Sequence, residues 1–146
     1  MKVERERFEE VLAMVRSEFP RLTVVVDRDH PHVDAMAELP VQPGLDFLVN
    51  FNLQGDELHL GSSHFWCEWF PCGSQRVHDE FKAAVRGVLP GQFWIRESFV
   101  LGRPSSARLQ RPESSGGSKT VATRRKVRSF LPLPRAHRIV QNRPSS

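Results

Sequence analysis

The two cysteines of the chain lie close to two histidines and could hold a metal ion. His64, Cys67, Cys72 and His78 follow the spacing H-x2-C-x4-C-x5-H. Thiolates and imidazoles are the ligands that tetrahedral zinc prefers, so the residue types suit this metal. The spacing differs from the common zinc-finger patterns, because it lacks a C-x2-C pair. If residues 64–70 form a strand, His64 and Cys67 also point to opposite faces. We therefore expect no metal here.

Cys72 could instead be a reactive thiol. It lies just before a helix that we expect to begin near Ser74, and the N-terminus of a helix can lower the pKa of a thiol. His78 is the nearest candidate base, but it falls inside that helix, and no known catalytic motif surrounds either cysteine. The sequence leaves Cys72 as a candidate nucleophile while favouring a structural cysteine.

Three aspartates and two histidines gather in the segment DRDHPHVD. Asp27, Asp29, His30, His32 and Asp34 offer ligands for a divalent cation, and a histidine that an aspartate orients could act as a general base. The segment does not follow the EF-hand loop, which requires glycine at its sixth position and glutamate at its twelfth. Polar residues around a proline are typical of a solvated loop between strands, which is the interpretation that we prefer.

Motifs of the common enzyme classes do not occur in the sequence. We find no glycine-rich phosphate loop, no G-x-S-x-G elbow and no H-E-x-x-H helix. This absence argues against the common enzyme classes, so we favour a non-catalytic protein, and we expect no catalytic residue, no metal and no cofactor. A small enzyme or metal-binding protein that uses the His30/His32 loop or Cys72 stays an alternative.

Hydrophobic periodicity predicts two amphipathic helices that would position these residues. The first covers residues 2–19 and is stopped by Pro20, because proline disfavours helical geometry in the residue before it. The second begins at Ser74 as a plausible N-cap and is closed by Pro90-Gly91. The apolar stripe of the second helix consists of Val77, Phe81, Ala84, Val85 and Val88.

Alternating and β-branched runs predict strands at residues 22–26, 45–53, 58–60, 64–70 and 93–101. The turn QGDE between the second and third of these suggests a hairpin. One helix, four strands, a second helix and a further strand indicate the α+β class. We expect a mostly antiparallel sheet with the two helices packed on one face.

The strand at residues 64–70 carries the clearest candidate binding surface. Alternation places Trp66, Glu68 and Phe70 on the face opposite Cys67, so they form an exposed apolar patch beside an acid if Cys67 faces the core. Tryptophan is enriched at the energetic centres of interfaces. We predict a non-catalytic protein-interaction module that binds a protein partner through these three residues. An immunity-like role, in which a small acidic protein neutralises a basic toxin, is one form of this function.

Charge divides the chain after residue 102. Residues 1–102 contain 10 Lys and Arg against 16 Asp and Glu, whereas residues 103–146 contain 11 against one, Glu113. The net charges are therefore −6 and +10, which sum to the +4 of the whole chain. We predict an acidic core domain over residues 1–102 and a basic C-terminal extension over residues 103–146.

The extension points to a second class of partner. Arg124, Arg125, Lys126 and Arg128 lie within five positions and could contact nucleic-acid phosphates, so nucleic-acid association is the alternative to protein binding. The runs SSARLQR and SKTVATRR flank PESSGG and predict a polar hairpin. VRSFL and HRIVQ are short strand-like runs that could extend the edge of the sheet. We expect residues 142–146 to fray.

The location of the protein follows from three negative observations. MKVERERFEE is charged where a signal peptide would be apolar, and two cysteines do not make a disulfide scaffold. No apolar run approaches the about 20 residues that span a bilayer. We expect a soluble, cytoplasmic protein that does not bind membranes. The partner's identity and the oligomeric state stay open.

Overall fold

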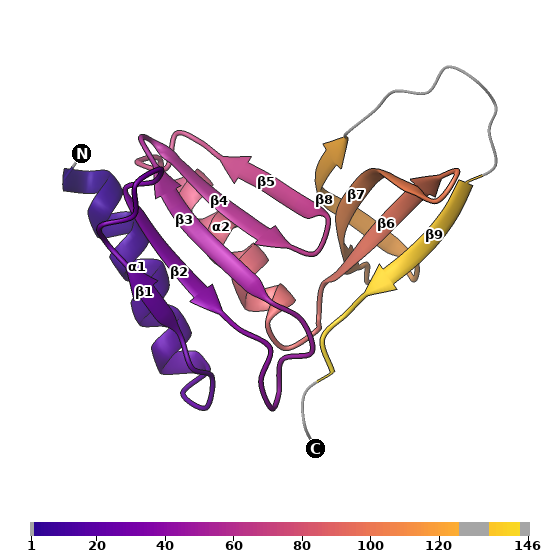
Figure 1. The fold of residues 1–146 in the computed structure, drawn as a ribbon, viewed down its shortest axis with the longest axis horizontal. Coiled ribbons are helices and arrows are strands. Elements are labelled where there is room, and N and C mark those ends of the chain that lie inside the picture. The colour runs from indigo at the N-terminus through magenta and orange to yellow at the C-terminus, as the bar shows by residue number, and fades with distance from the viewer. Residues whose placement is uncertain (1, 126–134, 144–146) are drawn as a thin grey trace.

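A computed structural model describes residues 2–125 and 135–143 of the chain. These residues form two helices and two antiparallel sheets, so the predicted α+β class is confirmed (Figure 1). The elements are, in chain order, α1 (Lys2–Glu18), β1 (Val25–Asp27), β2 (Ala35–Leu39), β3 (Val49–Gln54), β4 (Glu57–Ser62), β5 (Phe65–Trp69), α2 (Gln75–Val88), β6 (Trp94–Val100), β7 (Arg103–Pro112), β8 (Ser118–Arg125) and β9 (Arg135–Val140).

The first sheet is a five-stranded meander in which each strand pairs with its neighbour in the chain, in the order β1-β2-β3-β4-β5. Both helices lie on the same face of this sheet, as predicted (Figure 1). Cross-strand pairs such as Phe51–Leu60 and Leu53–Leu58 therefore point towards the helices. The intervening Asn50 and Asn52 point to the opposite face, because side chains alternate along a strand.

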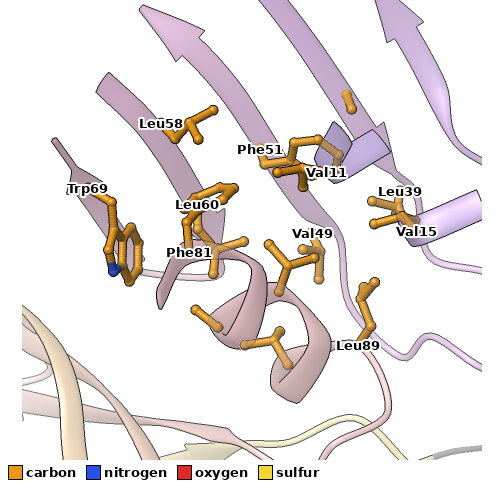
Figure 2. Packing of buried hydrophobic residues seen from close by; sticks show 14 of the residues in the cluster. Val11, Val15, Leu39, Val49, Phe51, Leu58, Leu60, Trp69, Phe81 and Leu89 are labelled. Carbon is orange, nitrogen blue, oxygen red and sulfur yellow. The ribbon is translucent and has the colours of Figure 1, made fainter. Parts of the chain in front are cut away.

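The main hydrophobic core fills the space between this sheet and the two helices (Figure 2). The ring of Phe51 on β3 lies 5.5 Å from that of Phe8 on α1 and 6.5 Å from that of Phe81 on α2. Trp69 on β5 lies 5.3 Å from Phe81 on its other side. Each fully buried side chain of this size contributes about 1.5–3 kcal/mol to folding, so this aromatic chain fixes both helices to the sheet.

Both predicted helices are confirmed with small differences at their ends. α1 ends at Glu18, one residue before the predicted end. Ser74 precedes α2 with an extended backbone (φ −65°, ψ 127°), as an N-cap does, but its side chain makes no capping hydrogen bond. All five residues of the predicted apolar stripe on α2 are buried.

The predicted strand at residues 45–53 is too long at its start. β3 begins at Val49, because Gln42 and Leu45 form an isolated bridge around the turn at Pro43-Gly44. Gly44 has φ +89°, a left-handed conformation that glycine adopts without strain. Leu45 is nevertheless fully buried, so the alternating pattern identified a core position but not a strand.

β2 was not predicted at all. Its sequence AMAEL is rich in residues with low strand propensity, and local composition therefore gave no signal. Ala35, Ala37 and Leu39 are buried while Met36 and Glu38 are half-buried, which is the alternation of a strand with one face on the core. The pairing of β2 with β3 fixes this strand, and its own residues do so only weakly.

The second sheet has four antiparallel strands in the order β8-β7-β6-β9. The hairpin predicted around PESSGG is confirmed as β7 and β8, and its turn contains Gly116 and Gly117 with φ of +86° and +81°. The run HRIVQ falls in β9, whereas VRSFL lies outside the described residues. The boundary drawn by charge after residue 102 lies between β6 and β7 of this sheet.

The chain after β9 returns to the first half of the molecule. Asn142 is 2% exposed, although it stands at the start of the segment expected to fray. Its side-chain Nδ2 donates hydrogen bonds to the carbonyls of Gly44 (2.7 Å) and Leu89, and its Oδ1 accepts one from the backbone N–H of Asp46 at 2.9 Å. A single asparagine thus connects β9 to the loop before β3 and to the end of α2.

Candidate functional site

The four residues of the possible zinc site do not meet in the structure. Among residues 2–125 and 135–143, no group of three or more histidine, cysteine, aspartate or glutamate side chains is arranged to hold a metal ion. His64 instead lies beside Phe99 of β6, with ring centroids 5.9 Å apart. The Nε2 of His78 lies 2.7 Å from Glu10 of α1. The ligand types are present, but the strand and the helix direct them to different neighbours.

The environment of Cys72 opposes a reactive thiolate. Its side chain is fully buried, and burial together with the charges of Glu4 and Asp56 raises the pKa of the Cys72 thiol. Burial and the nearby Glu68 likewise raise the pKa of Cys67. Because the thiolate is the nucleophilic form, these shifts keep both residues in their unreactive state.

His30 and His32 remain in a loop between β1 and β2. Their rings lie 5.8 Å apart, and the Nδ1 of His30 accepts a hydrogen bond from the backbone N–H of His32 at 3.2 Å. Asp27 caps the same loop by accepting a hydrogen bond from the N–H of Asp29 at 2.9 Å. These are contacts within a polar loop, and the described residues place no convergent ligand set around them.

The predicted patch on β5 is only partly open. The guanidinium carbon of Arg124 lies 4.7 Å from the ring centroid of Trp66, and the ring of His59 meets the same tryptophan edge-on at 4.7 Å. Glu68 is half-buried, whereas Phe70 is 58% exposed. Trp66 is therefore covered by β8 through a cation–π contact, and Phe70 is the accessible member of the set.

Ion pairs distinguish the first half of the molecule from the second. In residues 1–93, nine Lys and Arg face 15 Asp and Glu, and most of these cations contact a carboxylate. Arg28 reaches Glu9 at 2.8 Å and Arg86 reaches Glu18 at 2.9 Å. Five of these nine cations thus have a carboxylate partner within the protein.

Most of the described cations of the second half lack such partners. Residues 94–143 contain 12 Lys and Arg but only two acids, Glu97 and Glu113. Glu97 is buried and is used by Arg138, whose Nη2 lies 2.7 Å from its carboxylate. Within the described residues, the exposed cations with no ion pair or hydrogen bond from the side chain are Arg96, Arg103, Arg108, Arg111, Lys119, Arg135 and Arg143.

Two of these cations lie side by side at the centre of an open sheet face. Arg96 on β6 is the register partner of Arg108 on β7, and the same row continues to Thr123 on β8 and to Ile139 on β9. All four residues are exposed, whereas Ile95 and Leu109 on the other face are buried. We call the surface formed by Arg96, Arg108, Thr123 and Ile139 the basic face.

An aromatic residue and a histidine flank the basic face. Trp94, two residues from Arg96 and on the same side of β6, is half-buried, and its Nε1 donates a hydrogen bond to Gln110 at 3.1 Å. At the other end, the Nδ1 of His137 lies 3.0 Å from the hydroxyl of Ser98. Neither acid of this half lies on the basic face, because Glu97 points inward and Glu113 is in the hairpin turn. The face is therefore uniformly positive or neutral.

The predicted basic cluster is distributed differently from expectation. Arg124 lies on the opposite side of β8, over Trp66. Arg125 is the register partner of Ser106, and Lys126 and Arg128 lie outside the described residues. The sequence did not single out Arg96 and Arg108, since each is a single arginine in an unremarkable run. Alternation in WIRES and SARLQR, with Ile95 and Leu109 facing inward, is the signal that could have found them.

The fold and the basic face together define an α+β protein with a positively charged sheet surface. No family model, no curated protein and no solved structure matches the chain. Of the helices in the described part of the chain, none is long and apolar enough to cross a membrane.

Proposed function

We propose that the protein is a non-catalytic module that binds single-stranded nucleic acid along the basic face. The observation that carries the proposal is the adjacent pair Arg96 and Arg108, which are exposed and have no carboxylate partner among the described residues. Unpaired arginines on a flat surface suit a polyanion, because contacts with phosphates release counterions and supply most of the affinity.

The flanking residues favour a single strand over a duplex. Trp94, which is half-buried two residues from Arg96 on the same side of β6, offers an aromatic side chain against which an unpaired base could pack. Arginine guanidinium planes can also stack on bases while they contact phosphates. The exposed Thr123 on the same face adds a neutral hydrogen-bonding group that suits bases or sugars.

Fluorescence anisotropy with a short labelled oligouridylate tests this proposal. The variant Arg96→Gln/Arg108→Gln should bind at least about tenfold more weakly than the wild type, because each lost charge-assisted contact contributes about 1.5 kcal/mol or more. The control is Arg5→Gln/Arg16→Gln, which removes two exposed arginines from α1. If the two double variants lose the same affinity, binding depends on net charge alone and the basic face is not the site.

An acidic protein is the other polyanion that the basic face could bind. If the oligonucleotide does not bind at low salt while an acidic polypeptide such as polyglutamate does so through Arg96 and Arg108, the site is correct and the class of partner is wrong.

Phe70 supports a second candidate function, the protein-interaction module predicted from the sequence. Its side chain is 58% exposed and follows Glu68 on the acidic half of the molecule, where a basic protein such as a toxin could dock in an immunity-like complex. Phe70→Ser should abolish binding of such a partner. Val41→Ser should leave binding unchanged, because Val41 is similarly exposed, at 64%, but lies on another loop. A partner retained equally by both variants would exclude this surface.

We place either function in the cytoplasm. Cys67 and Cys72 are both free thiols, which is the state that a reducing compartment maintains.

A further inference from the structure

A groove separates helix α2 from the β7–β8 hairpin, on the side of that hairpin away from the basic face. Its volume is about 360 Å³. The floor is apolar and is formed by Trp69 of β5, Ala84 of α2, Phe93 and Val121 of β8. We call this site the α2 groove. Small-molecule sites commonly have volumes of about 300–1,000 Å³ and form where two structural units meet, which matches its size and place.

The floor of the α2 groove is held in place by tight packing. The backbone N–H of Phe93 donates a hydrogen bond to the carbonyl of Gly87 at 2.8 Å. A Cβ atom at Gly87 would lie 2.3 Å from the Phe93 ring, so the ring lies directly against the helix backbone. The ring of Trp69 packs edge-on against that of Phe81, with ring centroids 5.3 Å apart. The apolar floor is therefore formed before any ligand arrives, which lowers the entropic penalty of binding.

The rim of the α2 groove carries two positive charges in direct opposition. Arg111 and Lys119 are register partners across β7 and β8, and both are exposed. Like charges at directly opposed positions destabilise a sheet, and neither residue has an ion pair within the described part of the chain. The one carboxylate at the groove belongs to Glu80, which already contacts Arg76 at 2.7 Å. An anion between Arg111 and Lys119 would remove their repulsion.

We infer that the α2 groove binds a small organic anion that has an apolar body and a single carboxylate or sulfonate head. The body lies on the floor formed by Trp69, Phe93 and Val121, and the head contacts Arg111 and Lys119. Charge complementarity selects the head and apolar burial selects the body. This site lies apart from the basic face and does not depend on nucleic-acid binding.

Titration with 8-anilinonaphthalene-1-sulfonate, followed by competition, tests the inference. We expect saturable binding of one molecule per chain that octanoate displaces and that neither octanol nor inorganic phosphate displaces at the same concentration. Displacement by phosphate alone would show that the floor contributes nothing. Displacement by octanol as effective as that by octanoate would show that the rim contributes nothing. Either result overturns the proposal.

Two variants locate the binding. Ala83→Leu inserts a good helix-forming side chain at an exposed position that lines the groove, and it should weaken binding of the probe by about tenfold by occupying its space. Ala13→Leu makes the same change at an exposed position on α1 and should have no effect. Should Ala83→Leu fail to fold, Ala83→Glu provides the same test, because its carboxylate would repel the anion and compete for the rim. Unchanged affinity in the folded variant overturns the site.

The variant Arg111→Gln/Lys119→Gln tests the rim. It should weaken the binding of octanoate by about tenfold or more, because charge-assisted hydrogen bonds contribute about 1.5–3 kcal/mol each. The variant Arg96→Gln/Arg108→Gln should bind octanoate as tightly as the wild type does. That second variant separates failure of the α2 groove from failure of the basic face. Equal affinity in the rim variant and the wild type contradicts the inference.

Discussion

At the scale of single residues, the buried carboxylate of Glu97 joins the two halves of the molecule. Its side chain is 0% exposed, and it accepts hydrogen bonds from the Ser63 hydroxyl in the β4–β5 turn and from Arg138 on β9 at 2.7 Å. A buried charge is tolerated only when its partners compensate for the lost water. These contacts therefore connect the first sheet to both β6 and β9.

Removal of Arg138 alone should destabilise the protein more than removal of both charges of the Arg138–Glu97 pair. We expect Arg138→Gln to lower the free energy of unfolding by about 1–3 kcal/mol, because the buried Glu97 side chain loses its charge-assisted hydrogen bond from Arg138. Glu97→Gln in the Arg138→Gln background should restore much of this loss. Urea unfolding of the three variants measures the effect, with the exposed Arg135→Gln on the same strand as a near-neutral control. A double variant no more stable than Arg138→Gln would contradict this role.

His78 gives the stability a dependence on pH. Its side chain is fully buried at the α1–α2 contact, and desolvation, which outweighs the nearby Glu10 carboxylate, lowers the pKa of His78 below its ordinary value. The neutral ring donates from Nε2 to Glu10 at 2.7 Å and leaves Nδ1 without a partner in the described residues, which suits an unprotonated nitrogen. The folded state therefore prefers the neutral histidine.

The sign of the pH effect follows from that preference. The unfolded chain takes up a proton at about pH 6.5, whereas the folded state does so only at lower pH, so stability falls as the pH is lowered through this window. His78→Gln keeps an amide donor for Glu10 but cannot titrate, and its urea midpoint should vary less between about pH 5 and pH 7.5. His32→Gln, in an exposed loop, serves as the control. An unchanged pH profile in His78→Gln would show that other groups control it.

At the scale of elements, packing decides features that local composition does not encode. The helices and β3 to β6 were predictable because their apolar residues repeat with the period of the element. β2 was not, since alanines and a glutamate give a strand only when β1 and β3 pair with it. The outward direction of Trp66 was correct, but the sequence did not show that Arg124 would cover it. The basic face was missed because it combines single residues from four strands.

The junction between α2 and β6 depends on a glycine. Gly87→Ala should lower the free energy of unfolding by about 1–3 kcal/mol despite the better helix propensity of alanine, because the added Cβ would meet the Phe93 ring at 2.3 Å. Differential scanning calorimetry would measure this as a lower Tm. In a Phe93→Ala background the same substitution should be neutral or stabilising. If Gly87→Ala raises the stability of the otherwise unchanged protein, the ring moves aside easily and the floor of the α2 groove is not rigid.

At the scale of the whole molecule, charge and architecture coincide. Residues 1–93, which contain the helices and the five-stranded sheet, carry net −6, and residues 94–143, whose described part contains the four-stranded sheet, carry net +10. The two halves pack together through β5 and β8 rather than separating (Figure 1). In the acidic half, acids outnumber cations and five of the nine cations form internal ion pairs, so the net positive charge lies in the second half.

The salt dependence of oligonucleotide affinity tests the proposed nucleic-acid function most directly. Each phosphate contact on a single strand adds about 0.7 to the slope of log affinity against log salt. Arg96→Gln/Arg108→Gln should therefore reduce the slope by about 1.4, whereas Arg5→Gln/Arg16→Gln should leave it unchanged. A slope that stays the same in the basic-face variant, or an oligonucleotide that does not bind even at low salt, would contradict the proposal.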